Sequence, residues 1–184
     1  MIGTEDLRSE HSGVGRMLRI MESMAGSANK GEQLEADDLA QVIDFLRVFV
    51  DKCHHTKEEE LLFPAIRAAN ITSAEETILL LLEDHVRGRE TVGRVAAASR
   101  RLAEGDGLAN ADLADAMTAY VELLRAHIRR EEDECFDVAD RELPLAVRET
   151  LAEGYERIER EVVGGGVHEG FHALLDRLGD AYRV

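Results

Sequence analysis

The feature that most constrains this chain is a histidine and glutamate pair set within an apolar helical pattern. His54 and Glu58 continue a stripe of apolar residues at three-and-four spacing. Residues four apart on an α-helix share a face and lie about 6 Å apart along the axis, at a rise of ~1.5 Å per residue. Both side chains are therefore predicted to point into the core. His55 and Glu59 are predicted to lie about 100° away from that face, and Glu60 further round, toward solvent.

The same arrangement returns later in the chain. The stretch "HHTKEEELLF" from His54 and the stretch "HIRREEDECF" from His127 share histidine, glutamate and phenylalanine at equal offsets, so that Glu131 follows His127 by four residues. We therefore interpret the two stretches as pseudo-equivalent halves. Two further histidines, His11 and His85, fall on the apolar stripes of two other predicted helices.

Apolar periodicity and composition both predict an all-α protein. Prolines and aromatic residues are few, and three-and-four spacing recurs in four long segments. Asp37 is expected to cap the second helix, and Ser73 with Glu76 to form a capping box before the third. The expected long helices cover residues 4–25, 37–65, 73–102 and 111–131. Four such helices with short connections favour an up-down-up-down four-helix bundle.

The predicted domain organisation is a bundle over residues 1–140 with a C-terminal helical extension over 141–184. Pro144 suits the first position of a further helix. The glycine-rich stretch "VVGGGVHEGFH" then interrupts the pattern before a last short helix that ends near Tyr182. We expect this extension to pack on the bundle.

Charge and hydropathy exclude several classes of partner. The net charge of -16 would repel phosphate backbones and anionic lipid surfaces, so neither nucleic acid nor a membrane is expected as a partner. No apolar run is long enough to span a bilayer, and the start "MIGTEDLRSEH" is too polar for a signal peptide, which predicts a cytoplasmic protein. Cys53 and Cys135 are expected to be reduced thiols in the core.

The inward-facing ionisable residues predict a metal site. A single histidine on an apolar face is usually an ordinary core residue, but burying two carboxylates and four imidazoles unsatisfied would cost several kcal/mol per charge. Mixed imidazole and carboxylate ligands argue against a calcium-only site and against thiolate-rich structural zinc, and they suit iron, manganese or zinc. Because two carboxylates from facing helices can bridge a pair of ions, a di-iron centre is the leading interpretation.

The order of these motifs resembles a known family. His11, then "HHTKEEELLFP", "EDHVRGRE" and "HIRREEDE" are similar to the hemerythrin-like, HHE cation-binding proteins, and the resemblance covers roughly Leu7 to Asp140. It implies a four-helix bundle with a non-haem di-iron site, in which an oxo or hydroxo group bridges the two iron ions. The resemblance assigns the iron ligands as His11, His54, Glu58, His85, His127 and Glu131. In this assignment Glu58 and Glu131 are the bridges.

The chain departs from the oxygen-carrying hemerythrins at one place. These have a second histidine on the third helix, four residues from the first, whereas the positions at that spacing from His85 are Leu81 and Arg89. The six residues and a bridging oxygen would leave about two of roughly 12 octahedral positions open. The residues that could complete the site are His55, His168 and Glu169. For each of these residues, a place at the surface or behind a ligand is expected more often than the role of a ligand itself.

Two more residues near these motifs have open interpretations. Arg89 follows His85 by one turn and is either a partner of the site or a solvated end of the helical face. Tyr120 lies about two turns before His127 and is either a core aromatic or a hydrogen-bond donor near the pocket.

Three functional interpretations follow from the sequence. The first is a redox-active di-iron protein that reacts with oxygen, peroxide or nitric oxide, including the catalase-like and iron-centre-repair activities that the resemblance allows. The second is a module that binds or senses oxygen or iron without turnover. The third is a structural bundle whose polar cluster holds zinc or no metal. The missing fifth histidine favours the first, because both irons would be accessible to a peroxide.

Overall fold

The computed structural model describes residues 3–164 and 167–184. Within these ranges every regular element is a helix and no strand occurs, which confirms the all-α prediction. Across the same residues, no helix has both the length and the apolar character needed to cross a membrane. The side chains of His168 and Glu169, two of the candidates for completing the site, lie outside the described part of the chain.

The helices follow one another closely along the chain. The α-helices are α1 (Glu5–Asn29), α2 (Ala36–Asp44), α3 (Phe63–Ala68), α4 (Glu75–Ala103), α5 (Ala109–Arg130), α6 (Asp137–Glu142), α7 (Leu145–Ile158) and α8 (Val167–Tyr182). Wider π-helical segments join some of them, namely η1 (Phe45–His55), η2 (Glu58–Leu62), η4 (Glu131–Phe136) and η5 (Glu159–Val163). A short 3₁₀ turn, η3 (Thr72–Ala74), precedes α4.

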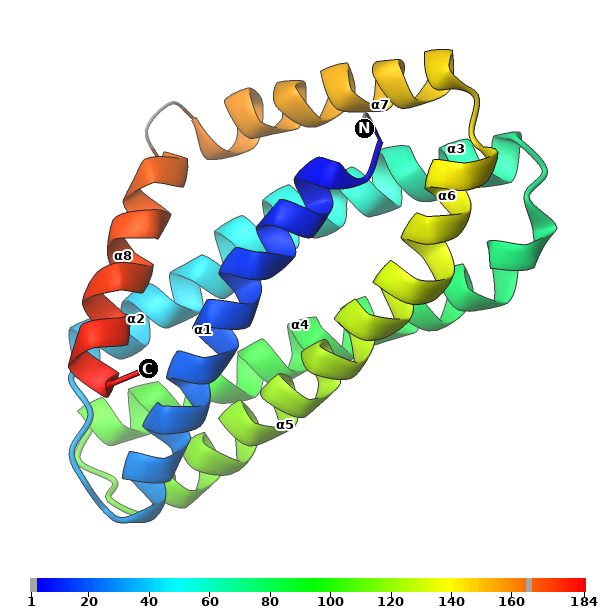
Figure 1. The fold of residues 1–184 in the computed structure, drawn as a ribbon. Coiled ribbons are helices and arrows are strands. Elements are labelled where there is room, and N and C mark those ends of the chain that lie inside the picture. The colour runs from blue at the N-terminus through cyan, green and yellow to red at the C-terminus, as the bar shows by residue number, and fades with distance from the viewer. Residues whose placement is uncertain (1–2, 165–166) are drawn as a thin grey trace.

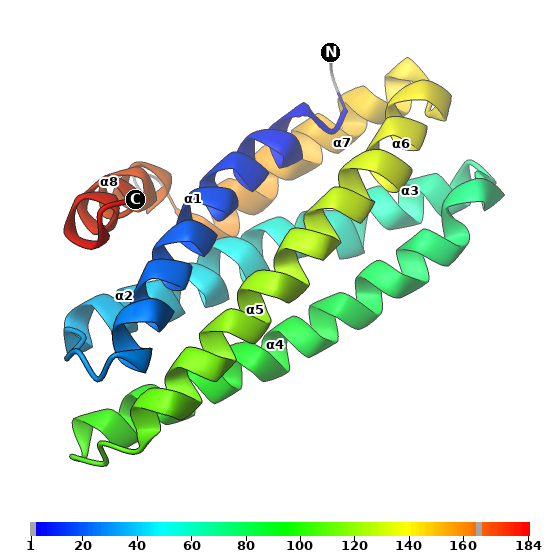
Figure 2. The ribbon, with the colours of Figure 1, turned by 60° about the horizontal axis from the view of Figure 1, so that its bottom comes forward.

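Four long helical segments lie side by side (Figures 1 and 2). Helix α1 packs against α5, α5 packs against α4, and the segment α2–η1 packs against both α4 and α1. The π-helical segments η1 and η2 continue α2 toward α3, and η4 continues α5 into α6. The four long rods of the structure are therefore α1, α2–α3, α4 and α5–α6. This arrangement is consistent with the predicted four-helix bundle.

The apolar core forms two main clusters with the ionisable residues between them. One cluster contains Val14, Val50 and Leu124, and the other contains Leu62 and Cys135. Along its helix, each of the predicted inward-facing histidines lies between residues of one cluster and residues of the other. The apolar faces therefore fix the four rods in register and hold the polar residues at the same level.

The C-terminal segment contributes to both clusters. Leu175 and Leu178 of α8 pack in the first cluster, beside α1, and Leu151 and Tyr155 of α7 pack in the second. Both α7 and α8 therefore share apolar clusters with the other helices. Because the two parts share their apolar clusters, the boundary near residue 140 stays a prediction from the sequence.

Several predicted helix ends differ from the structure. Helix α1 continues to Asn29 instead of ending near residue 25. Asp37 lies inside the first turn of α2, and Ser73 lies in η3, so neither acts as the predicted side-chain cap. Acidic residues occupy the first turns of both α2 and α4, where they stabilise the positive end of the helix dipole. Pro144 precedes α7 as its N-cap residue and is not its first helical residue.

Candidate metal centre

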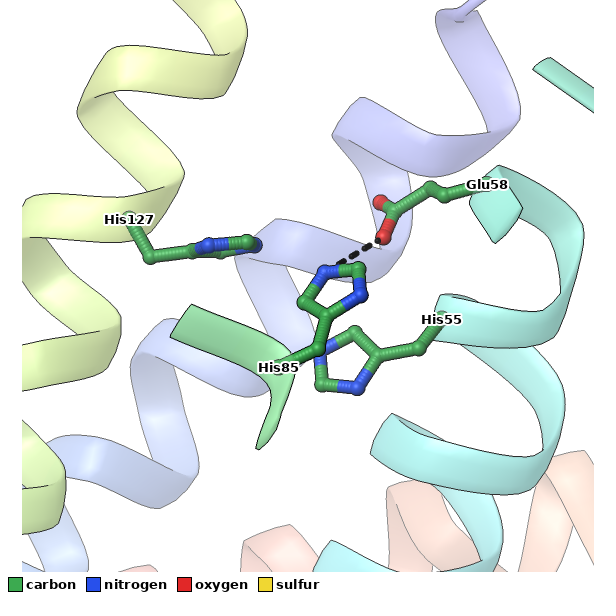
Figure 3. Close-up of side chains that lie close together, drawn as sticks. All are labelled: His55, Glu58, His85 and His127. Atoms are coloured by element: carbon green, nitrogen blue, oxygen red, sulfur yellow. Dashed lines mark ion pairs between the residues drawn. The ribbon is translucent and has the colours of Figure 1, made fainter. Parts of the chain in front are cut away.

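Seven buried side chains meet at the middle of the four rods. They are His11, His54, His55, Glu58, His85, His127 and Glu131. Their potential ligand atoms form two groups, and within each group all atoms lie within 4.8 Å of one another. One group is His11, His54, Glu58 and Glu131, and the other is His55, Glu58, His85 and His127 (Figure 3). All six residues singled out in the sequence are therefore brought together, and His55 joins them.

The two glutamates lie between the two groups. The Oε1 atom of Glu58 is 2.9 Å from the Nε2 of His54, and its Oε2 is 3.3 Å from the Nε2 of His85. The Oε2 atom of Glu131 is 3.4 Å from the Nε2 of His11 and 3.5 Å from the Nε2 of His127. Each carboxylate thus faces one histidine of each group, which is the placement that a bridging carboxylate requires.

The unsatisfied polar atoms at the site fit a metal. Several buried polar atoms of the site have no hydrogen-bond partner among the described residues. They are both oxygens of Glu58 and Glu131, both ring nitrogens of His55 and His127, and the Nε2 of His85. Buried polar groups in proteins nearly always have a partner. Imidazole nitrogens and carboxylate oxygens are also good ligands for iron, manganese and zinc. The donor set therefore fits cations better than it fits an ordinary core.

The position of His55 corrects the sequence prediction. It was expected to turn away from the inner face, yet it is 4% exposed and its ring stacks on that of His85. The reason is that η1 is a π-helix, in which hydrogen bonds run from i to i+5 and each turn holds more residues than an α-turn. Two adjacent histidines, His54 and His55, can then both face inward. Segments of this kind often occur at functional sites.

Outer carboxylates face the second ring nitrogen of every histidine in the centre. The Nδ1 atoms of His11, His54 and His85 donate hydrogen bonds to carboxylates at 2.7–2.8 Å, whereas those of His55 and His127 face theirs at 3.5 and 3.8 Å. The pairs are His11 with Glu132, His54 with Glu10, His55 with Asp51, His85 with Glu59 and His127 with Asp84. Such contacts orient an imidazole and direct its Nε2 toward a metal.

Two of these carboxylates correct the prediction further. The α-helical phase predicts that Glu59, and by the same reasoning its counterpart Glu132, points away from the core, but each accepts a hydrogen bond from a histidine of the centre on another helix. Their side chains are 29% and 34% exposed, so they lie at the rim of the site. Glu60, by contrast, is exposed as predicted.

The centre has an approximate two-fold arrangement that extends beyond the aligned stretches. In each half an acidic residue precedes the first histidine, a cation precedes the bridging glutamate, and a phenylalanine stacks on a histidine. The equivalent residues are Glu10 and Asp84, His11 and His85, His54 and His127, Lys57 and Arg130, Glu58 and Glu131, Glu59 and Glu132, and Phe63 and Phe136. At the position of His55, the second half has Ile128.

Sequence reasoning missed the acidic residues Glu10 and Asp84. Glu10 is 5% exposed and hydrogen-bonded to His54, and Asp84 faces His127. Both directly precede a histidine of the centre, so the dipeptides Glu-His and Asp-His were a repeated signal in the sequence. Their partners lie on other helices, and only packing brings them together.

Arg89 and Tyr120 have defined places in the structure. The guanidinium of Arg89 donates hydrogen bonds of 2.7 Å to both Asp51 and Glu59, the carboxylates that face His55 and His85. Arg89 is thus a partner of the site. Tyr120 is 2% exposed and belongs to the apolar core, and it also lines a groove that reaches the centre.

The groove leads from the surface toward His55. It has a volume of about 460 Å³ and lies between the segment α2–η1 and helices α4 and α5. Its lining includes Asp51, His55, Arg89, Gly93 and Tyr120. A small polar molecule could therefore approach the His55 side of the centre along this surface.

A second, narrow space also borders the centre. It is lined by His11, His54, His55 and His127 together with Val14, Val50, Leu124 and Ile128, and it is too small for a water molecule. The four histidines thus have an apolar surface on this side.

Burial and the carboxylates shift the pKa values of the histidines in different directions. Burial, followed by the neighbouring His85, lowers the pKa of His55 to about 4, so its imidazole is neutral at neutral pH. For His127, burial acts to lower the pKa, but the nearby carboxylates of Asp84 and Glu131 raise it overall to about 9. For Glu58, burial acts to raise the pKa, but His54 and His85 lower it well below its ordinary value. For Glu131, burial and the neighbouring Glu58 act to raise the pKa, but His11 and His127 lower it overall, so both bridging candidates are ionised, as metal ligands must be.

The two cysteines are apart from this chemistry. Both are buried free thiols, as predicted. Burial raises the pKa of the Cys53 thiol to about 12 and that of Cys135 even further. Neither sulfur belongs to a group that could hold a cation among the described residues.

Comparison with known proteins identifies the family. Residues 2–139 match the model of the hemerythrin HHE cation-binding domain. Over 177 residues the chain is 30% identical to the uncharacterized protein Mb2018 of Mycobacterium bovis and to the uncharacterized protein Rv1995 of Mycobacterium tuberculosis, which covers 96% of this chain and 67% of each relative. No protein of solved structure matches the chain significantly. The matched region contains all seven residues of the centre, and the chain belongs to the hemerythrin HHE cation-binding domain family.

Proposed function

We propose that this chain is a non-haem di-iron protein that binds oxygen or nitric oxide at the centre described above. The observation that supports this most directly is the set of five histidines and two glutamates, in which both carboxylates, both ring nitrogens of His55 and His127, and the Nε2 of His85 are buried without a hydrogen-bond partner among the described residues. Within this proposal the four rods are the up-down-up-down bundle of the family. Residues 1–140 form that bundle and residues 141–184 the extension.

The five imidazoles are divided unequally between the two ions. We assign His55, His85 and His127 to one iron and His11 and His54 to the other. Glu58 belongs to both ligand groups, and Glu131, which faces His11 and His127, is assigned as the second bridge. With a bridging oxygen this set would fill all but about one of roughly 12 octahedral positions. The free position then belongs to the iron held by His11 and His54. Bound iron would supply that position and the ability to change oxidation state.

The lining of the narrow space favours small and weakly hydrated ligands. Val14, Val50, Leu124 and Ile128 present apolar surface beside the histidines, and the space there excludes water. An apolar surface cannot replace the hydration shell of an ion or a strongly polar molecule. Oxygen and nitric oxide lose little hydration beside such an apolar surface, and a small movement of these side chains would make room for them, which supports binding or sensing of these gases.

Iron analysis and ligand titration test this function. We expect close to two iron atoms per chain, in line with the two ligand groups, and an oxo-bridged ferric pair that absorbs near the ultraviolet edge. Binding of nitric oxide to the reduced protein should saturate at about one equivalent per iron pair. One zinc and no iron would refute the proposal, and two equivalents of nitric oxide would refute the assignment of a single free position.

A second candidate function is catalase-like breakdown of peroxide, supported by the groove that reaches His55. This groove carries Arg89 and Asp51 and would admit a polar molecule such as hydrogen peroxide. The sequence favoured this activity because a fifth histidine was missing, but His55 now occupies the place of that ligand in the proposed centre. Stopped-flow spectra after mixing the reduced protein with oxygen distinguish the two functions. A stable adduct that releases oxygen under vacuum supports binding, and immediate oxidation with rapid peroxide decay supports turnover.

A further inference from the structure

A fully buried lysine lies next to the centre. Lys57 directly precedes Glu58 and is 0% exposed. Its Nζ donates one hydrogen bond to Glu10 and another, of 2.8 Å, to the Oε1 of Glu159. A buried ammonium group is stable only when carboxylates pair with it. Glu159 belongs to η5, outside the region that matches the family model.

Glu10 links this lysine to His54. One oxygen of Glu10 accepts the hydrogen bond from Lys57, and the other accepts a hydrogen bond of 2.7 Å from the Nδ1 of His54. Both oxygens of Glu10 are therefore engaged. Lys57 fixes the Glu10 carboxylate, and this carboxylate in turn orients the imidazole of His54. The Nε2 of the same imidazole faces Glu58 at 2.9 Å.

The C-terminal segment fits closely over Lys57. A Cβ atom added at Gly154 of α7 would lie 2.8 Å from a methyl carbon of Leu61 in η2, so a larger residue there would force Leu61 to move. The centre of the Tyr155 ring lies 5.9 Å from the Lys57 Nζ, and Ile158 packs with Cys53. The extension therefore shields the lysine from water and also supplies its second carboxylate.

The other half of the centre is built differently at the equivalent place. Arg130, the counterpart of Lys57, donates a hydrogen bond of 2.7 Å to Asp84, which faces His127. The Arg130 side chain is 31% exposed, so water can solvate it. The dependence on the extension is thus expected for His54 and not for His127.

We propose that Glu159 acts through Lys57 and Glu10 to position His54 for metal binding, which makes the C-terminal extension a working part of the centre. This inference rests on the proposed metal site. Loss of the Glu159 charge should loosen Glu10 and weaken the ion held by His11 and His54. The ion held by His55, His85 and His127 should bind as before.

Titration of the metal-free protein with Co²⁺, followed by its visible absorption, tests this proposal. The two binding steps are assigned first, because His54→Ala should remove one step and His55→Ala the other. Glu159→Gln is then expected to weaken the His54 step about tenfold and leave the other unchanged, in line with other carboxylates behind metal-bound histidines. The matched control is Glu161→Gln, an exposed glutamate of the same segment, which should change neither step.

Two further measurements separate positioning from a general structural role. Thermal melting of the metal-free Glu159→Gln and Glu161→Gln proteins measures any general loss of stability, which would weaken both binding steps, whereas loss of positioning weakens the His54 step alone. In a Lys57→Met background, Glu159→Gln should have no added effect on the His54 step. The proposal is overturned if Glu159→Gln leaves both steps unchanged or weakens both equally. If the unaltered protein binds no Co²⁺, the metal site itself is refuted, and this inference with it.

Discussion

The imidazoles of His55 and His85 are stacked, with ring centres 3.9 Å apart and planes inclined by 17°. Parallel stacking places both rings at one side of the centre, where each belongs to the ligand group that also contains His127. Loss of one imidazole from a three-histidine group should therefore release that ion and spare the other. We expect His55→Ala to lower the iron content from close to two to about one per chain, measured by elemental analysis.

An exposed histidine provides the control for that measurement. His172 lies on α8 and is exposed, so His172→Ala should keep the full iron content. Equal iron loss in the two variants would show that His55 is not a ligand.

Glu59 and Glu132 test the role of the outer carboxylates. Each accepts a hydrogen bond from the Nδ1 of a histidine, so Glu59→Ala and Glu132→Ala should each lower metal affinity about tenfold. Removal of the shared Glu58 should be far more severe and release both ions. Affinities can be compared by competition with a coloured chelator.

Neighbouring exposed acids serve as controls for these two variants. Glu60 and Asp133 follow them directly in the sequence and point to solvent. Their replacement by alanine removes the same net charge and should leave the affinity unchanged. A similar loss in Glu60→Ala would mean that overall charge, and not the contact with histidine, controls binding.

Metal uptake should release protons at neutral pH. Burial acts to lower the pKa of His127, but Asp84 and Glu131 raise it to about 9, above the ordinary value of 6.5. In the metal-free protein the stabilisation from this raised pKa is complete below pH 6.5 and is lost as the pH rises through 9. A metal needs the neutral imidazole, so apparent affinity should increase from pH 7 toward pH 9.

Calorimetry in buffers with different ionisation enthalpies measures this release. About one proton per chain is expected to come from His127 on metal binding near pH 7.5. In a His127→Ala protein that proton should be missing. Uptake of protons on metal binding would contradict the prediction.

The groove beside His55 can be tested by narrowing it. Gly93 lines the groove, and no atom lies within 4 Å of a Cβ placed there, so Gly93→Leu can add bulk without disturbing the fold. If peroxide reaches the iron by this route, its reaction rate should fall by roughly tenfold, whereas oxygen entering elsewhere should react as before. Gly15→Leu, at an open position of α1, is the matched control. An unchanged peroxide rate would exclude the groove as the route.

The sequence predicted the parts of the centre that follow α-helical periodicity. His54 and Glu58 were found because four-residue spacing places both on an apolar face, and the same reasoning found His127 and Glu131. His55 could not be found in this way, since the wider π-turn of η1 changes which residues share a face.

Contacts between distant parts of the chain were also beyond the sequence. Glu10 and Glu159 both contact Lys57, although the two acids are 149 positions apart in the sequence. Periodicity describes one helix at a time and does not specify which faces of two helices meet. The apolar clusters determine that register, and the buried charges follow from it.

The two halves of the centre differ at one equivalent position, which is His55 in the first half and Ile128 in the second, and this difference makes the centre asymmetric. Two identical hairpins would create two indistinguishable metal positions, and an incoming molecule would have no reason to choose between them. In the proposed centre the extra imidazole of His55 would fill one metal position, while the isoleucine at the equivalent place adds only apolar surface. A difference at one position of a repeated pattern is therefore enough to make the two proposed metal positions inequivalent.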